Sequence, residues 1–270
     1  DPRSPIPDPR SPIPVVQSPP VYEPVRELPY QPAPRQVLPL ERLGALVEVL
    51  ICSGYPSQIL LILVLRGFGM DMRTPGGRLS PPFVFTLSLV DAVLVVGLVL
   101  FFLRAHHESA ATVLLGGRRV LREALLGLAV VPAIFLVAVL MLGLILHFAP
   151  QLHNVTVNPL EDMLRNRRDA LIFAAVVMIA GGVREEVQRG FIVHRFGQYL
   201  GGAGWGVAVY SVAFGFGHAD QGIDAMLVTA LLGAVWGLLY IARRSIVAGV
   251  VSHAGFNLAQ LVKYLALAPK

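Results

Sequence analysis

Long apolar runs dominate the chain from about residue 43 onward, and most of them have the length of a membrane-crossing helix. A bilayer core takes roughly 20 apolar helical residues to cross. Because every backbone polar group in lipid needs an internal partner, each run is expected to be helical. The pattern predicts an all-α, polytopic transmembrane helical bundle of about seven helices, or eight. The seven segments are 43–65, 83–103, 124–148, 170–193, 203–218, 223–242 and 246–267.

The first 40 residues differ from this apolar part of the chain. The heptapeptide Asp-Pro-Arg-Ser-Pro-Ile-Pro occurs at 1–7 and again at 8–14, and further prolines follow. Proline at that density blocks helices and sheet ladders. We expect a disordered Pro-rich tail over 1–40, with a polyproline ligand for a partner as the alternative. N-terminal transmembrane helices over 41–165 and a second helical group over 166–268 would follow it.

Composition and charge agree with a membrane protein. Hydrophobic residues make up 55% of the chain and charged residues 14%, whereas soluble domains carry about 25% charged residues. The net charge of +5 comes from arginine, which in membrane proteins usually gathers in cytoplasmic loops. No basic stripe is interleaved with aromatic residues, so nucleic-acid binding is not expected. The single cysteine, Cys52, allows no intrachain disulfide.

Charged residues inside apolar segments are the strongest indication of function, because each costs roughly 2.5–3.5 kcal/mol to place in a bilayer. Glu185 and Glu186 lie in the fourth segment. Arg189 is four residues after Glu185 and would share its helix face. One arginine cannot neutralise two carboxylates, and a carboxylate beside another in a partly dry site suits a general base that activates water. The alternative is a solvated helix end at the membrane surface.

Two further pairs of residues spaced by one helical turn occur in other segments. Phe214 and His218 end the fifth segment, and His253 and Asn257 lie within the seventh. A buried histidine and asparagine can donate hydrogen bonds to a developing oxyanion. Taken singly, the first pair could be interfacial and the second a polar clamp between helices. Together, the three groups supply a base, a water-orienting imidazole and an oxyanion pair.

The order Glu-Glu-x-x-x-Arg, Phe-x-x-x-His and His-x-x-x-Asn resembles the signature of the CAAX prenyl protease and bacteriocin-processing family, also called CPBP or ABI intramembrane glutamic proteases. The resemblance covers about residues 165–265, so 166–268 would be the CPBP/ABI-like catalytic transmembrane core. It implies an intramembrane endopeptidase that hydrolyses peptide bonds of a membrane-associated or lipidated protein or peptide. Its partners would be membrane lipid and that substrate, and its expected location is the plasma (inner) membrane of a bacterium.

The resemblance also implies roles for single residues. Glu185 would activate water, His218 would orient that water, and His253 with Asn257 would hold the oxyanion. Glu186, Arg189 and Phe214 would have supporting roles, with Arg189 holding the carboxylate geometry. No cofactor is expected, although Glu185, His218 and His253 could form a three-ligand zinc set.

Helix rise tests whether these residues can meet. At about 1.5 Å per residue, Glu185 and His253 are nearly level, whereas His218 is too deep toward the other face. We therefore expect the fifth helix to be displaced, and the link 219–224 to line a wet cavity with Asp220 and Asp224 at its border.

Two other functions compete with proteolysis. One is a non-proteolytic membrane scaffold or bacteriocin-immunity protein of the same fold. The other is a proton-coupled transporter, whose buried ionisable residues would form a proton path. Transporters often show internal repeats, and no repeat relates the two halves of this chain.

Overall fold

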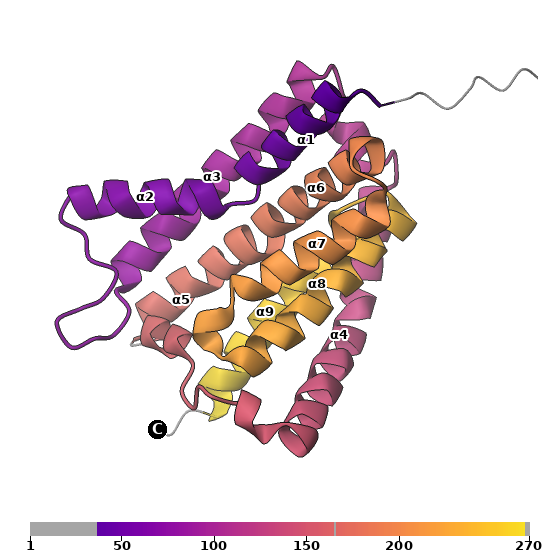
Figure 1. Ribbon diagram of the computed structural model, residues 1–270. Helices are drawn as coiled ribbons and strands as arrows, with labels where there is room; N and C mark the ends of the chain where they lie inside the picture. The colour runs from indigo at the N-terminus through magenta and orange to yellow at the C-terminus, as the bar shows by residue number, and fades with distance from the viewer. Residues whose placement is uncertain (1–36, 165, 268–270) are drawn as a thin grey trace, which may run out of the picture. The chain divides into compact units, whose positions relative to one another are not determined.

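The computed structural model describes residues 37–164 and 166–267, so the predicted tail lies almost wholly outside the described residues. The described residues are helical, and their only β feature is one isolated bridge between Arg73 and Leu79. Figure 1 shows the helices. In chain order they are α1 (Pro39–Ile51), α2 (Tyr55–Gly67), α3 (Pro81–Ala105), η1 (Ala111–Leu115), α4 (Val120–Phe148), η2 (Pro150–Leu152), η3 (Pro159–Leu164), α5 (Arg167–Val176), η4 (Val177–Arg184), α6 (Glu185–Tyr199), α7 (Ala203–Phe216), η5 (Ala219–Gln221), α8 (Ile223–Arg243) and α9 (Val247–Leu267).

Each predicted apolar segment coincides with one helix or with a broken helix. Three helices, α3, α4 and α8, are long and apolar enough to cross a membrane alone. The bent pair α1–α2 adds a fourth crossing if it counts as one span, and α7 and α9 are shorter apolar helices. This is an integral membrane protein with a helical bundle. The total of about seven or eight spans stays a prediction.

The first apolar segment is broken between α1 and α2, which meet at 42°. The break lies at Gly54, whose φ of +84° is a left-handed conformation that glycine adopts without strain. Pro56 follows in the first turn of α2, where its missing N–H removes no helical hydrogen bond. The break therefore comes just before Pro56, at the one glycine between the two helices.

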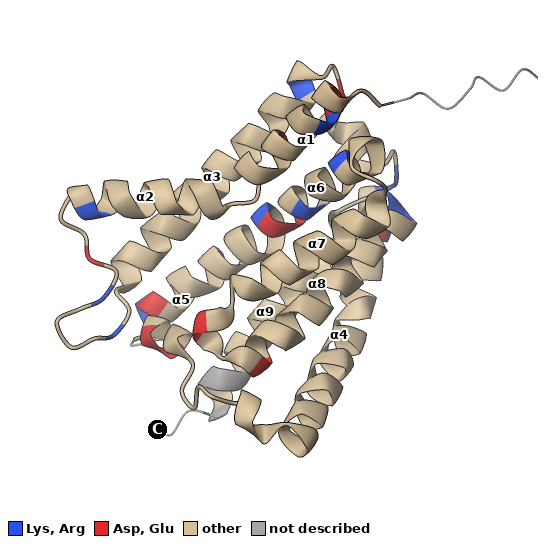
Figure 2. Cartoon of the chain, in the orientation of Figure 1, with Lys and Arg blue, Asp and Glu red and all other residues tan. Residues whose placement is uncertain are grey.

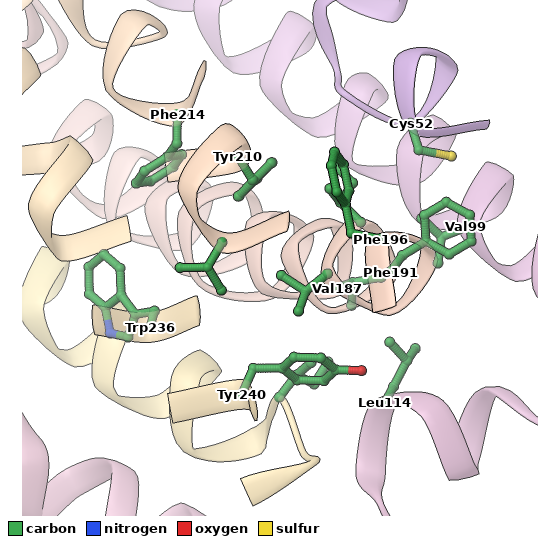
Figure 3. Close-up of a cluster of buried hydrophobic side chains, with 14 of the residues drawn as sticks. Cys52, Val99, Leu114, Val187, Phe191, Phe196, Tyr210, Phe214, Trp236 and Tyr240 are labelled. Atoms are coloured by element: carbon green, nitrogen blue, oxygen red, sulfur yellow. The ribbon is translucent and has the colours of Figure 1, made fainter. Parts of the chain in front are cut away.

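Helix α6 lies at the centre of the hydrophobic core. Phe191 and Ile192 on α6 are fully buried, as are Leu103 of α3 and Trp236 of α8. Figure 3 shows α6 side chains meeting aromatic rings from α7 and α8. Around this centre α7 packs on α6 and α8, and α4 packs on α9. The face of α6 that begins with Glu185 is thus enclosed by helices distant in sequence.

Charged side chains lie mostly at helix ends, apart from a group partway along the α5–η4–α6 segment (Figure 2). That group includes Glu186 and Arg189, which are each 1% exposed. Buried charge is costly in lipid unless it is paired. The alternative of a solvated helix end is therefore wrong for this pair, although Glu185 itself is only partly buried.

Candidate active site

Helix α6 starts directly after eight residues of π-helix, η4, which packs along α9. Short π-helical stretches inside α-helices are frequent at functional sites. Two glycines make the close approach possible: a Cβ on Gly181 would lie 2.5 Å from Nδ2 of Asn257, and one on Gly182 would lie 2.8 Å from Cβ of Ala254. The glycine pair thereby lets α9 bring His253 and Asn257 against the start of α6.

His253 contacts both glutamates. Its Nδ1 lies 2.9 Å from Oε1 of Glu186, and its Nε2 lies 3.6 Å from Oε2 of Glu185. Arg189 donates a hydrogen bond to Oε1 of Glu186. An ionised carboxylate only accepts hydrogen bonds, so Nδ1 of His253 carries the proton in that contact. The other ring nitrogen, Nε2, is then directed toward Glu185.

The partner of Arg189 differs from the expectation. The four-residue spacing predicted a helix face shared with Glu185, but the guanidinium binds Glu186, three residues before it. Glu185 has Arg184 nearby instead, with NH1 3.9 Å from its Oε1. The two carboxylates thus have different surroundings: Glu186 is buried in an ion pair, and Glu185 keeps 16% of its side-chain surface exposed.

The rings of Tyr210, Phe214 and Trp236 form an aromatic box around the Arg189 guanidinium and the His253 imidazole. Trp236 stacks on His253 with centroids 3.8 Å apart, and its Nε1–H donates to Oγ of Ser252 at 3.1 Å. The Arg189 guanidinium carbon lies 4.9 Å from the Phe214 ring centroid, and the rings of Tyr210 and Trp236 are only slightly farther away. Such cation–π contacts are favourable away from water. Phe214 therefore supports the charge pair through its ring.

His218 lies just past the end of α7 and is half-buried. Its Nδ1 is 2.9 Å from the carbonyl oxygen of Phe214. A carbonyl only accepts, so Nδ1 donates and the Nε2 of a neutral ring is left as an acceptor. The Phe214 ring packs edge-on against the imidazole at 4.9 Å. One phenylalanine therefore positions both His218 and Arg189.

A cavity of about 460 Å³ opens beside these residues and is lined by all four predicted catalytic residues, Glu185, His218, His253 and Asn257. Its other walls are largely apolar. They include Val84, Leu160, Phe173, Val176, Leu232 and Phe256. A second cavity of about 100 Å³ is lined by Glu185 and His218 together with residues of the α1–α2 break. Glu185 and His218 therefore lie between the two spaces.

The link after α7 only partly follows the prediction. Gln221 lines the large cavity. Asp224 instead is buried, and its Oδ2 lies 2.6 Å from Nδ1 of His153. Among the described residues that line the large cavity, neither Asp220 nor Asp224 occurs. The expectation that these two acids border the cavity is wrong, because Asp224 is bonded to the loop after α4.

Sequence reasoning did not single out three residues of this neighbourhood. Trp236 and Tyr210 lie in apolar runs, where an aromatic residue looks like any other core position. Asp91 of α3, which binds Arg184 through Oδ2 at 2.6 Å, carried a signal that could have found it. It is the only charged residue within the predicted segment 83–103, and such a residue in a span usually has a functional partner.

In the part of the chain that the structure describes, no three His, Cys, Asp or Glu side chains form a group that could hold a metal ion. The absence of a cofactor stays a prediction. Nδ1 of His253 is occupied by Glu186, and Nδ1 of His218 by a backbone carbonyl.

The segment from α5 into α9 carries every residue of the predicted catalytic set. Residues 167–259 match the family model described as type II CAAX prenyl endopeptidase Rce1-like. This segment, called the Rce1-like domain for its match, is similar to that family. The resemblance drawn from the three ordered motifs is thereby confirmed. The chain matches no curated protein and no solved structure. Helices α1 to α4 precede the Rce1-like domain, and α3 supplies Val84 and Ser88 to its large cavity.

Proposed function

We propose that this chain is an intramembrane endopeptidase in which Glu185 activates water to hydrolyse a peptide bond. The substrate would be a membrane-associated or lipidated protein or peptide. The observation that carries the proposal is the position of Glu185 at the large cavity, shared with His218, His253 and Asn257. The Rce1-like match supports a CAAX-type protease at the level of the family.

The proposed chemistry assigns one step to each group. A water between Glu185 and His218 would give a proton to the Glu185 carboxylate while its oxygen attacks the peptide carbonyl. Nε2 of His218, free of the backbone contact, would accept a hydrogen bond from that water. The amide of Asn257 would donate to the oxyanion. Glu185 would then pass its proton to the departing amine.

His253 fits an oxyanion role in one protonation state only. Its Nδ1–H is committed to Glu186. The neutral ring therefore presents an Nε2 lone pair toward Glu185, and only the imidazolium has an Nε2–H to donate. An oxyanion role for His253 therefore requires protonation of the ring, which its burial beside Arg189 opposes.

The substitution Glu185→Gln tests the proposal. It keeps the size of the side chain but removes the base, so we expect kcat for a fluorogenic lipidated peptide to fall by about 10²–10⁴-fold. The assay uses the purified full chain in lipid vesicles. Glu123→Gln is the control, because Glu123 is also a glutamate inside an apolar segment, is 2% exposed and paired with Arg243, yet lines neither described cavity. An equal kcat for wild type and Glu185→Gln would show that Glu185 is not the base, and no hydrolysis by either protein would favour the scaffold or immunity protein instead.

The proposal is metal-free, and this aspect has its own test. A chelator such as 1,10-phenanthroline should leave kcat unchanged after prolonged incubation. A loss of activity that zinc restores would show that the base is a metal-bound water rather than Glu185 alone.

A further inference from the structure

A buried ion pair joins the helices before the Rce1-like domain to the proposed base. Asp91 of α3 and Arg184 at the end of η4 are 3% and 8% exposed, and their Oδ2 and NH2 atoms are 2.6 Å apart. Ser57 of α2 donates to the other oxygen of Asp91. Gln58 contributes a longer hydrogen bond of 3.4 Å to Oδ2. Three elements, α2, α3 and η4, thus converge on one carboxylate.

The same guanidinium approaches Glu185 on its other side. NH1 of Arg184 lies 3.9 Å from Oε1 of Glu185, against 2.6 Å for the contact to Asp91. Attraction between opposite charges weakens with distance and is strong in a dry interior. The Arg184 guanidinium therefore pairs mainly with Asp91 rather than with Glu185. Without that carboxylate, the nearest acidic partner of Arg184 would be Glu185.

The α1–α2 break is shaped around the guanidinium. A Cβ on Gly54 would lie 2.2 Å from NH2 of Arg184, and the backbone there has a positive φ. Only glycine fits both conditions. The helix break therefore leaves room for Arg184 in the position in which it reaches Asp91.

We infer that Asp91 is a positioning residue that holds Arg184 away from a full ion pair with Glu185 and so keeps that carboxylate available to water. The inference rests on the proposed function of Glu185. It adds to the site a residue that lies outside the matched segment 167–259. Asp91 acts through Arg184, and neither residue lines the large cavity among the described residues. Arg184 does line the smaller cavity, so it is substrate binding in the large cavity that should not depend on either side chain.

The test compares kcat and KM of the wild type, of Asp91→Asn and of the double variant Asp91→Asn with Arg184→Gln. Each protein is measured as the full chain in vesicles. In Asp91→Asn the guanidinium turns to Glu185, so kcat should fall on the order of 10–100-fold with KM within about twofold of wild type. In the double variant no guanidinium remains to capture Glu185, so kcat should return to within about threefold of wild type. A merely structural role would make the double variant at least as impaired as the single one.

Controls separate this inference from the function on which it rests. Glu123→Gln removes a buried carboxylate from another ion pair, with the partly exposed Arg243 at 2.6 Å, and should leave kcat of the folded protein unchanged. If Asp91→Asn does not fold, the kcat of the double variant still tests the inference, because the double variant has neither Asp91 nor Arg184 as an unpaired buried charge. A double variant as slow as Asp91→Asn, or far slower than wild type, overturns the inference. A wild-type kcat in Asp91→Asn also overturns it, while inactive Glu185→Gln would leave the proposed function standing.

Discussion

At the scale of single residues, the two adjacent glutamates have separate surroundings although they are neighbours in sequence. Glu186 accepts from Arg189 and from His253 and is almost fully enclosed. Glu185 meets the cavity and has only longer contacts, at 3.6 Å to His253 and 3.9 Å to Arg184. The tightly bonded carboxylate fixes the imidazole, and the loosely bonded one faces the cavity.

The substitution Gly181→Ala tests how closely α9 must approach η4. Its new Cβ would lie 2.5 Å from Nδ2 of Asn257, and the end of that side chain can move away. We expect little change in thermal stability, because alanine favours helix more than glycine does. Displacement of the proposed oxyanion donor should lower kcat by roughly tenfold or more.

Gly143→Ala is the control for that experiment, because a Cβ on Gly143 of α4 meets nothing within 4 Å. Its kcat should equal that of the wild type. If Gly181→Ala and Gly143→Ala have the same kcat, the amide of Asn257 does not need its present position.

At the scale of helices, the sequence pattern located nearly every element because apolar runs in lipid have to be helical. The predicted segments 83–103 and 223–242 correspond closely to α3 and α8. The π-helix η4 was not predictable, because its widened turns depend on packing against α9 rather than on local composition. The partner of Arg189 was missed for the same reason: spacing allowed both Glu185 and Glu186, and the fold selected one.

A cluster of charges at the end of α6 shows how the helices are fastened together outside the site. Arg195 of α6 donates to Glu48 of α1 at 2.6 Å and also to Glu108 in the link between α3 and η1. His194 lies 2.8 Å from the same Glu108 carboxylate. Arg195, which is fully buried, thereby connects α6 to α1 and to the link between α3 and η1.

This cluster predicts a loss of stability in acid. Burial raises the pKa of Glu108, but hydrogen bonds from Arg195, Gln198 and His194 outweigh it and hold that pKa below its usual range. A carboxyl whose pKa is lower in the folded state contributes stability above its unfolded value of about 4.3, and the contribution is lost as pH falls through the folded pKa. The unfolding midpoint in detergent should therefore drop as pH decreases below about 4.3.

Glu108→Gln isolates that contribution. It should lower the unfolding midpoint at neutral pH, because Arg195 loses one of its two carboxylates. It should also flatten the decline in acid relative to wild type. Parallel pH curves for the two proteins would mean that another group is responsible.

At the scale of the whole molecule, the matched domain and the helices before it share one site. The large cavity takes walls from α3 and η3 as well as from the Rce1-like domain. From the sequence alone, Glu185, His218, His253 and Asn257 could be singled out, because three motifs with polar residues stood out against apolar runs, and all four line this cavity. It could not locate the aromatic box or the walls of the cavity, since apolar residues that face a substrate and apolar residues that face lipid form the same pattern.

Cysteine labelling can show whether substrate occupies the large cavity. Ser88 of α3 lines it, so Ser88→Cys should react with a small thiol reagent, and saturating peptide substrate should slow that reaction about tenfold or more at [S] of ten times Kd. The wild type is the built-in control, because its one cysteine, Cys52, is 0% exposed. Unchanged labelling in the presence of substrate would place the binding site elsewhere.

The ion pair between Asp91 and Arg184 has a consequence for modularity. Family boundaries suggest that 167–259 could be cut out or transplanted as a unit, yet that fragment would carry Arg184 into hydrocarbon without its counter-charge. The matched segment is therefore not freely interchangeable: a new set of preceding helices would have to supply an acid at the position of Asp91 to pair with Arg184. A chimera that lacks this acid should recover its folding when Arg184 is changed to a neutral residue. A single position would then decide whether the transplanted segment folds.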